Sequence, residues 1–437
     1  MKSLNSNVLM MLLALMSLPV RASDTFETNK YMLDMVSAGV SSRTLMRVKV
    51  FPHDKDYKPQ GLDTKRDQFS VSSDGVCQLL PAAHDKVQAT GPVSQKFSKI
   101  TFTAATLGSA VIIRCAQPFK LERAGVSSLN SYSYSGSLYV RAVAGELEAI
   151  NLIDLKNYLR GVVPSEVYRD WPIETLKTQA VAARTYAVYH LIYARRFSSD
   201  RLWDVDDTIN FQAYTGTSLI SDKTDSAITN TEGQILTFRG NVIQAFYHAD
   251  SGGQTEDALS VWSQAIPFTV ARPEAPEVEV AKNVWERTFS LATLEQELRA
   301  TGYLDAGKSL RSIVIPIVGR SPSGRVKSMA LIDSAGQHKA FPLNVFRKVA
   351  GQLPSPLFYI EKDPKAVRTM VIKGVGFGHG VGMSQQGAAA LAGQKAWDYK
   401  QILSYYYLNT TLCSLDTANE SIPDCKSQRV AQAQATR

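Results

Sequence analysis

Hydrophobic and polar residues alternate in short runs through the first third of the chain, which predicts β-strands. Residues 45–51 (LMRVKVF) alternate between apolar and polar side chains, and residues 99–105 and 110–115 are rich in Ile, Val, Phe and Thr. Turn-forming residues separate these runs. We therefore expect a small all-β accessory region over residues 23–134.

After this region the pattern changes to a strand pair followed by a long helix. Residues 137–143 and 147–155 predict two paired strands, and Pro172 favours a helix start. Residues 173–196 predict a helix in which small side chains would let a neighbouring element pack closely. One face of this helix carries Leu176, Ala180, Ala183, Ala187 and Leu191.

The remainder of the chain mixes strand and helix patterns. We expect strands at 234–238 and 242–247, a short helix at 291–301, a strand pair within 310–332 that turns at 321–324, and a glycine-rich turn at 374–382 that leads into a helix from 384. The fold class is therefore α+β, with one dominant Ala-rich helix packed on β-strands. The tail after Cys425 is polar and of low complexity, and we expect it to be mobile.

The N-terminus predicts export. Lys2 gives a positive start, residues 8–18 form a short apolar run, and Val20 and Ala22 suit a cleavage site after residue 22. The run is short for a membrane span, although an uncleaved anchor is the alternative. Residues 1–22 are therefore expected to be a signal peptide, and no later stretch predicts a transmembrane segment. We expect an exported protein of the periplasm or cell envelope.

Cysteines and charge agree with export. The chain has four cysteines, and pairing Cys77 with Cys115 and Cys413 with Cys425 is the simplest of three possible connectivities. The formal net charge is +8, and removal of Lys2 and Arg21 with the signal leaves +6. This excess suits an acidic polymer such as a cell wall, but a solvated basic surface without a partner explains it equally well. Export disfavours nucleic acid as a partner.

One segment places a single acidic residue before the long helix. Residues 161–166 (GVVPSE) predict a turn that carries Glu166 between a strand and the helix. Burial in a cleft raises the pKa of such a carboxyl group, which suits a general acid near neutral pH. The alternative is that Glu166 pairs with a Lys or Arg and only holds the turn in place.

Two further segments gather polar side chains around glycines. Residues 246–255 (FYHADSGGQT) crowd His248 and Ser251 at a turn, and residues 374–388 (GVGFGHGVGMSQQGA) surround His379 with glycines. Glycines at this density permit close backbone approach, but their spacing fits no phosphate-binding loop. An ordinary polar hairpin end and a tight packing loop are the alternative interpretations.

Together these segments resemble the SpoIID/LytB family in kind and order. The matching stretches are YLRGVVPSE, LKTQAVAARTYA, QAYTG, FYHADSGGQT and GFGHGVGMSQQGA, between residues 158 and 388. The resemblance covers residues 135–413, which we take as the SpoIID/LytB catalytic domain, with a disulfide-tied end and tail at 414–437. No motif of this kind occurs before residue 135.

The resemblance implies a peptidoglycan lytic transglycosylase that prefers glycan strands without stem peptides. It places the catalytic glutamate at Glu166. It also implies substrate-binding roles for Arg184, Tyr186, Lys177, Gln212, Tyr214, His248, Ser251, His379, Ser384 and Gln385. Because LytB-type relatives are amidase enhancers, a non-catalytic glycan-binding protein that activates a cell-wall amidase is the alternative. Ordinary glycoside hydrolysis needs two carboxyl groups, and Asp170 resembles a helix-start residue, so a single-acid mechanism fits better.

One departure concerns a metal site. Some family members carry a CDTTHCQ-like zinc-binding stretch, and here the corresponding residues 206–212 read DDTINFQ. Asp206 and Phe211 stand where the cysteines would be, and a phenylalanine cannot bind zinc. We therefore predict no metal and no cofactor.

Overall fold

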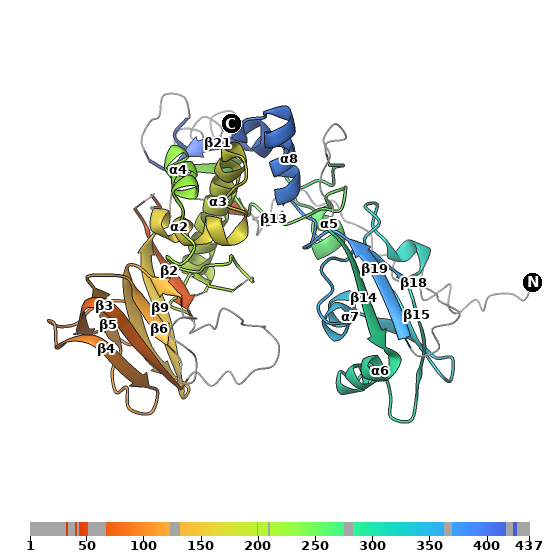
Figure 1. The fold of residues 1–437 in the computed structure, drawn as a ribbon, viewed down its shortest axis with the longest axis horizontal. Helices are drawn as coiled ribbons and strands as arrows, with labels where there is room; N and C mark the ends of the chain where they lie inside the picture. The colour runs from red at the N-terminus through yellow and green to blue at the C-terminus, as the bar shows by residue number, and fades with distance from the viewer. Residues whose placement is uncertain are drawn as a thin grey trace, which may run out of the picture. The chain divides into compact units, whose positions relative to one another are not determined.

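The computed structural model describes residues 32–33, 40–41, 43–50, 67–122, 132–198, 200–208, 210–274, 283–361, 369–416 and 423–425. The predicted signal peptide and the polar tail after Cys425 lie outside these residues. Within the described part of the chain, helices and strands are both abundant (Figure 1), which confirms the α+β class.

Nine strands of the described residues form one sheet, in the order β10-β2-β9-β8-β5-β3-β6-β7, with β4 paired to β3. Alternating burial along β2 follows from the alternating sequence that predicted it. The sheet is continuous across residue 134, because β8 pairs with β5 on one side and with β9 on the other. The strands are β2 (Leu45–Val50), β3 (Gln68–Pro81), β4 (Gln95–Thr103), β5 (Val111–Cys115), β6 (Phe119–Glu122), β7 (Ser133–Tyr134), β8 (Ser137–Val143), β9 (Glu146–Asp154) and β10 (Val205–Asp206).

Both expected disulfides are present. Cys77 on β3 lies directly opposite Cys115 on β5 and is bonded to it. Cys413 is bonded to Cys425, twelve residues further along the chain. Neighbour pairing is therefore confirmed.

The residues before Glu166 form a helix, which corrects the expected turn. α2 (Leu155–Glu166) begins at Asp154, whose carboxylate accepts a hydrogen bond from the backbone N–H of Asn157. Gly161 is needed inside this helix because a Cβ atom there would lie 2.5 Å from the carbonyl oxygen of Gly216. Pro164 lies in the last turn, and Glu166 is the final helical residue.

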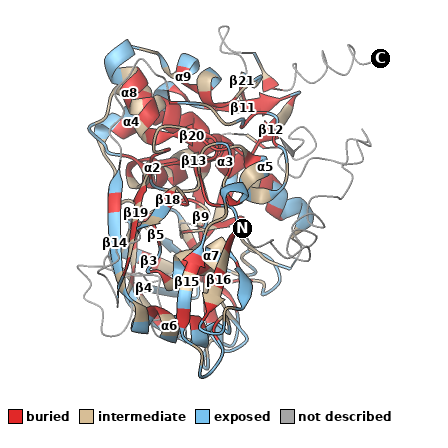
Figure 2. Cartoon of the chain, turned by 90° about the vertical axis from the view of Figure 1, so that its right-hand side faces the viewer, coloured by how far each residue is buried: buried red, intermediate tan, exposed pale blue. Residues whose placement is uncertain are grey.

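The long helix α3 (Ile173–Phe197) confirms the expected central helix. It contacts α2, α4 (Asp222–Asn230), α8 (Gln385–Lys395) and α9 (Tyr399–Tyr406). It is buried on nearly every side, as the red colouring in Figure 2 shows. Its alanines allow this close packing.

Two smaller sheets join segments that are distant in sequence, and the first of them contacts α3. One has the order β1-β12-β11-β21, formed by β1 (Met32–Leu33), β12 (Asn241–Ile243), β11 (Gln234–Phe238) and β21 (Thr411–Ser414). The other pairs β13 (Tyr247–His248) with β20 (Met383–Ser384) in parallel. This pairing brings the two glycine-rich segments together. A short helix, α5 (Ala258–Trp262), follows the first of them.

Residues 284–375 form a unit with its own hydrophobic core, which the sequence patterns did not separate from the rest. Trp285, Leu298, Phe346 and Ile372 are among its buried residues. Two three-stranded sheets, β14-β19-β18 and β15-β16-β17, flank this core. Its elements are β14 (Val284–Ser290), α6 (Leu291–Ala300), β15 (Leu310–Val314), η3 (Ile317–Gly319), β16 (Met329–Asp333), β17 (His338–Phe341), α7 (Leu343–Val349), β18 (Phe358–Glu361) and β19 (Thr369–Val375). We call residues 284–375 the inserted domain.

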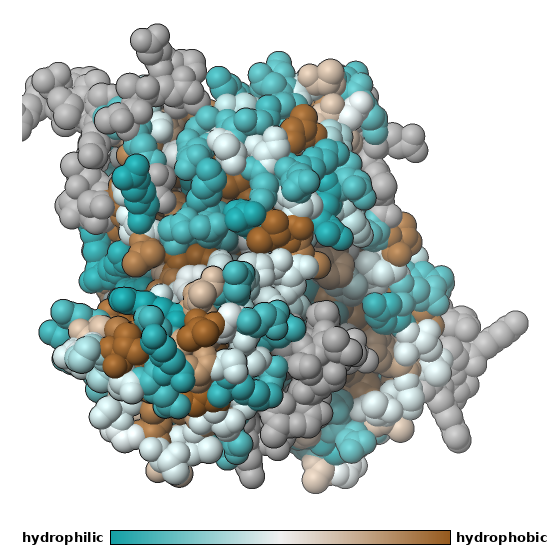
Figure 3. Space-filling model, turned by 60° about the vertical axis from the view of Figure 1, so that its left-hand side comes forward, coloured by the Kyte–Doolittle hydropathy of each residue, from teal (hydrophilic) through white to brown (hydrophobic). Residues whose placement is uncertain are grey.

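Large hydrophobic side chains on the surface are scattered. Leu45, Val76 and Val93 are exposed on or beside the large sheet. On the face that Figure 3 shows, hydrophobic residues lie in small separate patches among hydrophilic ones, which is ordinary for a globular surface. Among the described helices, none has the length and apolar character needed to cross a membrane.

Candidate active site

Glu166 occupies a partly buried position at the C-terminal end of α2. Burial raises its pKa from 4.5 to about 7, although hydrogen bonds from the Ala213 backbone N–H and the Tyr247 side chain favour the charged form. The Ala213 N–H lies 2.7 Å from Oε1 of Glu166. At neutral pH both protonation states of this carboxyl group are therefore populated, as a group that both gives and takes a proton requires.

A hydrogen-bonded chain of side chains leads to Glu166. The Tyr158 hydroxyl donates to Oε1 of Gln212 at 3.2 Å, and Nε2 of Gln212 donates to the Tyr247 hydroxyl at 3.0 Å. Tyr247 in turn donates to Glu166. The Tyr186 ring lies 6.2 Å from that of Tyr247. Burial raises the pKa of Tyr158, Tyr186 and Tyr247, and the Glu166 charge raises it further.

Of the residues in this chain, Gln212 and Tyr186 were expected at the site, whereas Tyr158 and Tyr247 were not. Both missed tyrosines lie inside the matching segments YLRGVVPSE and FYHADSGGQT. No spacing or charge pattern marks either tyrosine, so only the segments that contain them could have indicated a role.

His248 lies against His379, which belongs to the glycine-rich turn at 374–382. Their ring centroids are 5.7 Å apart. Nδ1 of His248 lies 3.1 Å from the carbonyl oxygen of Val381, and the Val381 N–H donates to Nδ1 of His379 at 3.0 Å. Gly378 is required here because its Cβ atom would lie 2.8 Å from that of His248.

Both imidazoles are neutral near pH 7. Burial lowers the pKa of His379 to about 4 and that of His248 well below its ordinary value, and the Arg325 guanidinium lowers both further. His379 also hydrogen-bonds the backbone of Tyr247, the residue whose side chain reaches Glu166. The histidine pair and the acid are therefore linked through one residue.

Arg325, from the inserted domain, was not expected at the site. Its guanidinium donates to the carbonyl oxygens of Ser251 at 2.6 Å and Gln254 at 2.9 Å. Gly380 packs directly on it, since a Cβ atom there would lie 2.5 Å from Cζ of Arg325. The buried Glu256 carboxylate accepts hydrogen bonds from Ser321 and Ser323, which lie just before Arg325 in the sequence. The inserted domain thus supports both glycine-rich segments.

Three expected binding residues have buried side chains that hold local structure. Ser384 caps α8 by accepting the Gly387 N–H at 3.1 Å. Ser251 accepts the Gly253 N–H at 3.1 Å, and Nε2 of Gln385 donates to Gln179 at 3.3 Å. These contacts shape the two loops around His248 and His379.

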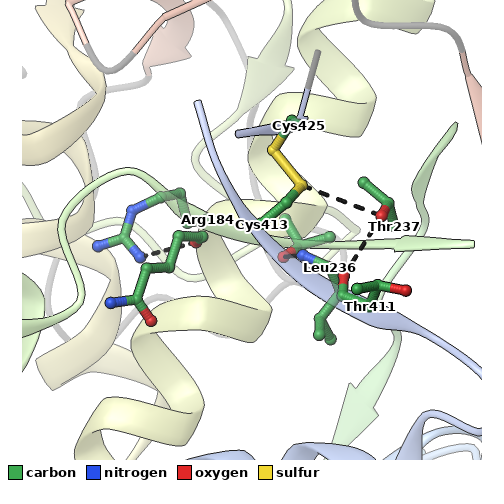
Figure 4. Close-up of a disulfide and its surroundings, with 8 residues drawn as sticks. Arg184, Leu236, Thr237, Thr411, Cys413 and Cys425 are labelled. Carbon is green, nitrogen blue, oxygen red and sulfur yellow. Dashed lines mark hydrogen bonds between the residues drawn. A yellow bond between two sulfur atoms is a disulfide. The ribbon is translucent and has the colours of Figure 1, made fainter. Parts of the chain in front are cut away.

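Arg184 lies against backbone carbonyl groups. Its guanidinium donates to the carbonyl oxygens of Gln234 and Ile228, each at 3.1 Å, and Arg184 is only 3% exposed. Figure 4 shows it near the Cys413–Cys425 disulfide, whose Cys413 sulfur lies 3.9 Å from the Thr237 hydroxyl. This arrangement favours a structural role for Arg184 over the substrate contact that the resemblance implied.

Two other expected residues are also engaged within the protein. Nζ of Lys177 lies 2.7 Å from the Glu174 carboxylate. The buried Tyr214 hydroxyl donates to Asn151 at 2.8 Å, and its ring packs 5.1 Å from that of Tyr158. Tyr214 therefore packs against Tyr158, the first residue of the hydrogen-bonded chain that leads to Glu166.

The described residues of the stretch at 206–212 are engaged in contacts within the protein. Asp206 accepts hydrogen bonds from the backbone N–H and hydroxyl of Thr208, and the Phe211 ring packs edge-on against His190 and Trp203. Across the described residues, no group of three or more His, Cys, Asp or Glu side chains lies where it could hold a metal ion.

Asp170, the other acidic residue of the segment, is exposed. It lies two residues before Pro172, the residue that precedes the first turn of α3, so it does not cap the helix as expected. Its backbone carbonyl accepts a hydrogen bond from Lys223.

Comparison with known proteins places these features in a family. The family model described as SpoIID, Stage II sporulation protein, matches residues 143–238. The chain is 31% identical to Stage II sporulation protein D of Bacillus subtilis over 280 residues, 62% of this chain and 77% of that protein. The chain belongs to the SpoIID/LytB family. It is also 30% identical to an uncharacterized protein of Brachyspira hyodysenteriae, over 68% of this chain and 77% of that protein.

Another relative in the SpoIID/LytB family bears a different name. The chain is 28% identical to the amidase enhancer of Bacillus subtilis, over 59% of this chain and only 40% of that longer protein. A second family model, described as a domain of unknown function (DUF8618), matches residues 275–382. It covers the inserted domain and the loop that carries His379.

Proposed function

We propose that the protein is a peptidoglycan lytic transglycosylase with Glu166 as its general acid and base. The observation that carries the proposal is the Glu166 carboxyl group, whose pKa is raised to about 7 at the end of the family's GVVPSE segment. A carboxylic acid that remains partly protonated at neutral pH can give its proton to a leaving oxygen.

The reaction needs one carboxyl group. Glu166 protonates the glycosidic oxygen between N-acetylmuramic acid and N-acetylglucosamine while the bond from that oxygen to the muramyl C1 breaks. The carboxylate then accepts the proton of the muramyl 6-hydroxyl, whose oxygen forms the new bond to C1. The products are a 1,6-anhydro-muramyl end and a free N-acetylglucosamine 4-hydroxyl, and Glu166 is protonated again. The intramolecular attack benefits from a high effective molarity.

The surroundings of Glu166 support this single-acid scheme. Asp170, the nearest acidic residue in sequence, is exposed, and the described contacts of Glu166 are an N–H group and a hydroxyl group. Tyr247 and the Ala213 N–H would stabilise the carboxylate that forms after proton donation. Gln212, Tyr158 and Tyr186 hold Tyr247 in position. Nε2 of the neutral His248 would offer a hydrogen bond to a sugar hydroxyl or acetamido group, whereas His379 is bonded to the backbones of Val381 and Tyr247.

Stripped strands would be the better substrate, because stem peptides hang from the lactyl group beside the reacting carbon. Mass spectrometry of products from denuded and intact peptidoglycan tests both parts of the proposal. We expect 1,6-anhydro-muramyl ends, formed faster from denuded strands. Reducing-end muramic acid as the main product would mean a hydrolase instead, and equal rates on both substrates would remove the preference alone.

The second candidate function is a non-catalytic amidase enhancer, which the amidase enhancer relative favours. Such a protein would bind glycan and activate a cell-wall amidase. Incubation of the isolated protein with purified denuded strands separates the two functions. Product formation without an amidase supports the transglycosylase, whereas its absence, together with faster amidase turnover when the protein is added, supports the enhancer.

A further inference from the structure

The inserted domain carries a hollow of its own on the sheet β14-β19-β18. Its volume is about 620 Å³, within the range of small-molecule and sugar sites. Residues of all three strands and of the turn at 320–324 line it, among them Val284, Trp285, Arg320, Leu357, Tyr359 and Lys373. We call it the β19 hollow.

The β19 hollow presents apolar and aromatic surface to solvent. Tyr359 is 53% exposed and Val284 is 76% exposed, while the Trp285 ring forms the floor beneath Gly374. Figure 2 shows long exposed stretches on β14. A flat aromatic side chain beside a shallow apolar wall is suited to stacking against the C–H face of a sugar ring, because both surfaces are apolar.

Arg320 adds a positive charge to the hollow. Its guanidinium donates to the carbonyl oxygens of Gly324 at 2.7 Å and Phe358 at 2.9 Å. Neither acceptor is charged, and the ion pairs of the described residues give Arg320 no acidic partner. Lys373 differs, because it lies 3.0 Å from Glu361 and 3.6 Å from Glu286. Arg320 is therefore the lining cation whose charge is available to an anionic ligand.

The hollow shares a wall with the candidate active site. Gly252, in the FYHADSGGQT segment, packs on the hollow's Leu357 and Val375, since its Cβ atom would lie 3.0 Å from each side chain. β19 ends at Val375 and leads directly into the loop that carries Phe377, which is 54% exposed, and His379. The strand that lines the hollow is therefore joined by one short loop to the residue that forms the histidine pair with His248.

We propose that the β19 hollow is a remote subsite for the glycan strand, in which Tyr359 stacks on a sugar ring and Arg320 binds a free lactyl carboxylate. This inference rests on the proposed function for the identity of the strand. A muramyl residue carries a free carboxylate only after its stem peptide has been removed, so the subsite would read the denuded state directly. It would also give the inserted domain, which matches a domain of unknown function, a role in substrate choice.

Calorimetric titration of the full-length exported protein, carrying Glu166→Gln so that strands stay uncut, tests the subsite. The probes are amidase-stripped glycan strands of uniform length and N-acetylglucosamine oligomers of the same length, which lack the lactyl group. We expect Tyr359→Ala to raise the Kd for stripped strands about tenfold. Arg320→Gln should raise it by a similar factor and remove the difference between the two probes. Ile317→Ala truncates a 96% exposed side chain elsewhere in the inserted domain. It should change neither the Kd for stripped strands nor the difference between the two probes.

A Kd for stripped strands that is unchanged in a folded Tyr359→Ala protein would overturn the subsite. The subsite would also be overturned if Tyr359→Ala lost binding to peptide-bearing strands or to an amidase while still binding stripped strands. That result would favour a peptide-binding sheet edge. Failure of the proposed function gives a different result, because a protein that binds stripped strands through Tyr359 but never cuts them keeps the subsite and loses the chemistry.

Discussion

The backbone N–H of Ala213 donates a 2.7 Å hydrogen bond to the Glu166 carboxylate. Ala213 lies between Gln212 and Tyr214 in the QAYTG segment, so two segments that are distant in sequence meet at the acid. The bond favours the carboxylate, whereas burial favours the neutral acid. Their balance leaves the pKa near 7, which is the property that the proposed chemistry needs.

Glu166→Gln should abolish strand cleavage and leave the fold intact, because it removes the exchangeable proton at nearly constant volume. General acid–base catalysis contributes about 10²–10⁴-fold, so product formation should fall by at least that factor. Asp170→Asn is the matched control, and it should retain activity. A folded Glu166→Gln protein that cuts at the native rate would contradict the assignment.

The same substitution has a predictable effect on stability. The Glu166 pKa of about 7 in the folded state exceeds its ordinary value of 4.5. Neutral Glu166 therefore stabilises the fold below pH 4.5, and this contribution is lost as the pH rises through 7. The melting temperature of Glu166→Gln at pH 8 should accordingly equal or exceed that of the native protein, and a lower value would mean that the carboxylate itself holds the fold.

The rate of strand cleavage should fall at alkaline pH. The first step needs protonated Glu166, and the fraction in that form falls tenfold per pH unit above a pKa of about 7. We expect kcat/KM to decline with this fraction as the pH rises above the pKa. Tyr247→Phe should shift the decline to higher pH, because it removes a hydrogen bond that favours the carboxylate. A rate that stays constant from pH 6 to pH 9 would show that Glu166 does not act as the acid.

The sequence predicted the elements whose pattern is local. Strand β2, the Ala-rich helix α3 and the helix α6 occur where periodicity placed them, whereas the strand expected at 242–247 is divided into β12 and β13. Helix α2 was missed because Gly161, Pro164 and Ser165 are turn formers, and only the structure shows that Gly161 is small to admit Gly216. Tertiary packing outweighed local preference at this point.

The candidate site was predictable only in part. The resemblance located Glu166, Gln212 and the two histidines, and the structure brings them together through Tyr247. The resemblance could not show that the Arg184 guanidinium is hydrogen-bonded to backbone carbonyl groups. A buried arginine and an arginine that lines a cleft can stand in the same sequence motif. The sequence also provided no indication of Arg325. It reaches the site from the inserted domain, which no sequence pattern distinguished from the rest of the chain.

The Cys413–Cys425 disulfide should stabilise the edge of the sheet that contains β21. It closes a short loop after β21, which pairs with β11 beside the Arg184 contacts. Replacing both cysteines by serine should lower the free energy of unfolding by about 2–4 kcal/mol. Denaturant unfolding measures this, with the Cys77→Ser/Cys115→Ser protein as the comparison. An unchanged midpoint would mean that the sheet edge is held by β-pairing alone.

Purified protein should contain no stoichiometric zinc, and chelators should change neither activity nor melting temperature. The reason is that Phe211 packs against His190 and Trp203, where a zinc-binding relative would carry a cysteine, and that Asp206 is bonded to Thr208. Elemental analysis checks the expectation. One tightly bound zinc per chain would show that other side chains had replaced the cysteines.

Gly380→Ala should reduce both stability and activity, because the added methyl group would lie 2.5 Å from the Arg325 guanidinium carbon. Arg325 would then lose its hydrogen bonds to Ser251 and Gln254, and the loops around His248 and His379 would shift. Gly145→Ala separates this effect from backbone strain: its φ of +83° nearly equals the +86° of Gly380, but nothing lies within 4 Å of its Cβ position. Strain alone costs about 1–2 kcal/mol, so Gly145→Ala should lose that much stability and keep its activity. Gly380→Ala should lose more stability and at least tenfold in kcat/KM. Equal losses in the two proteins, with activity intact in both, would mean that Arg325 does not support the site.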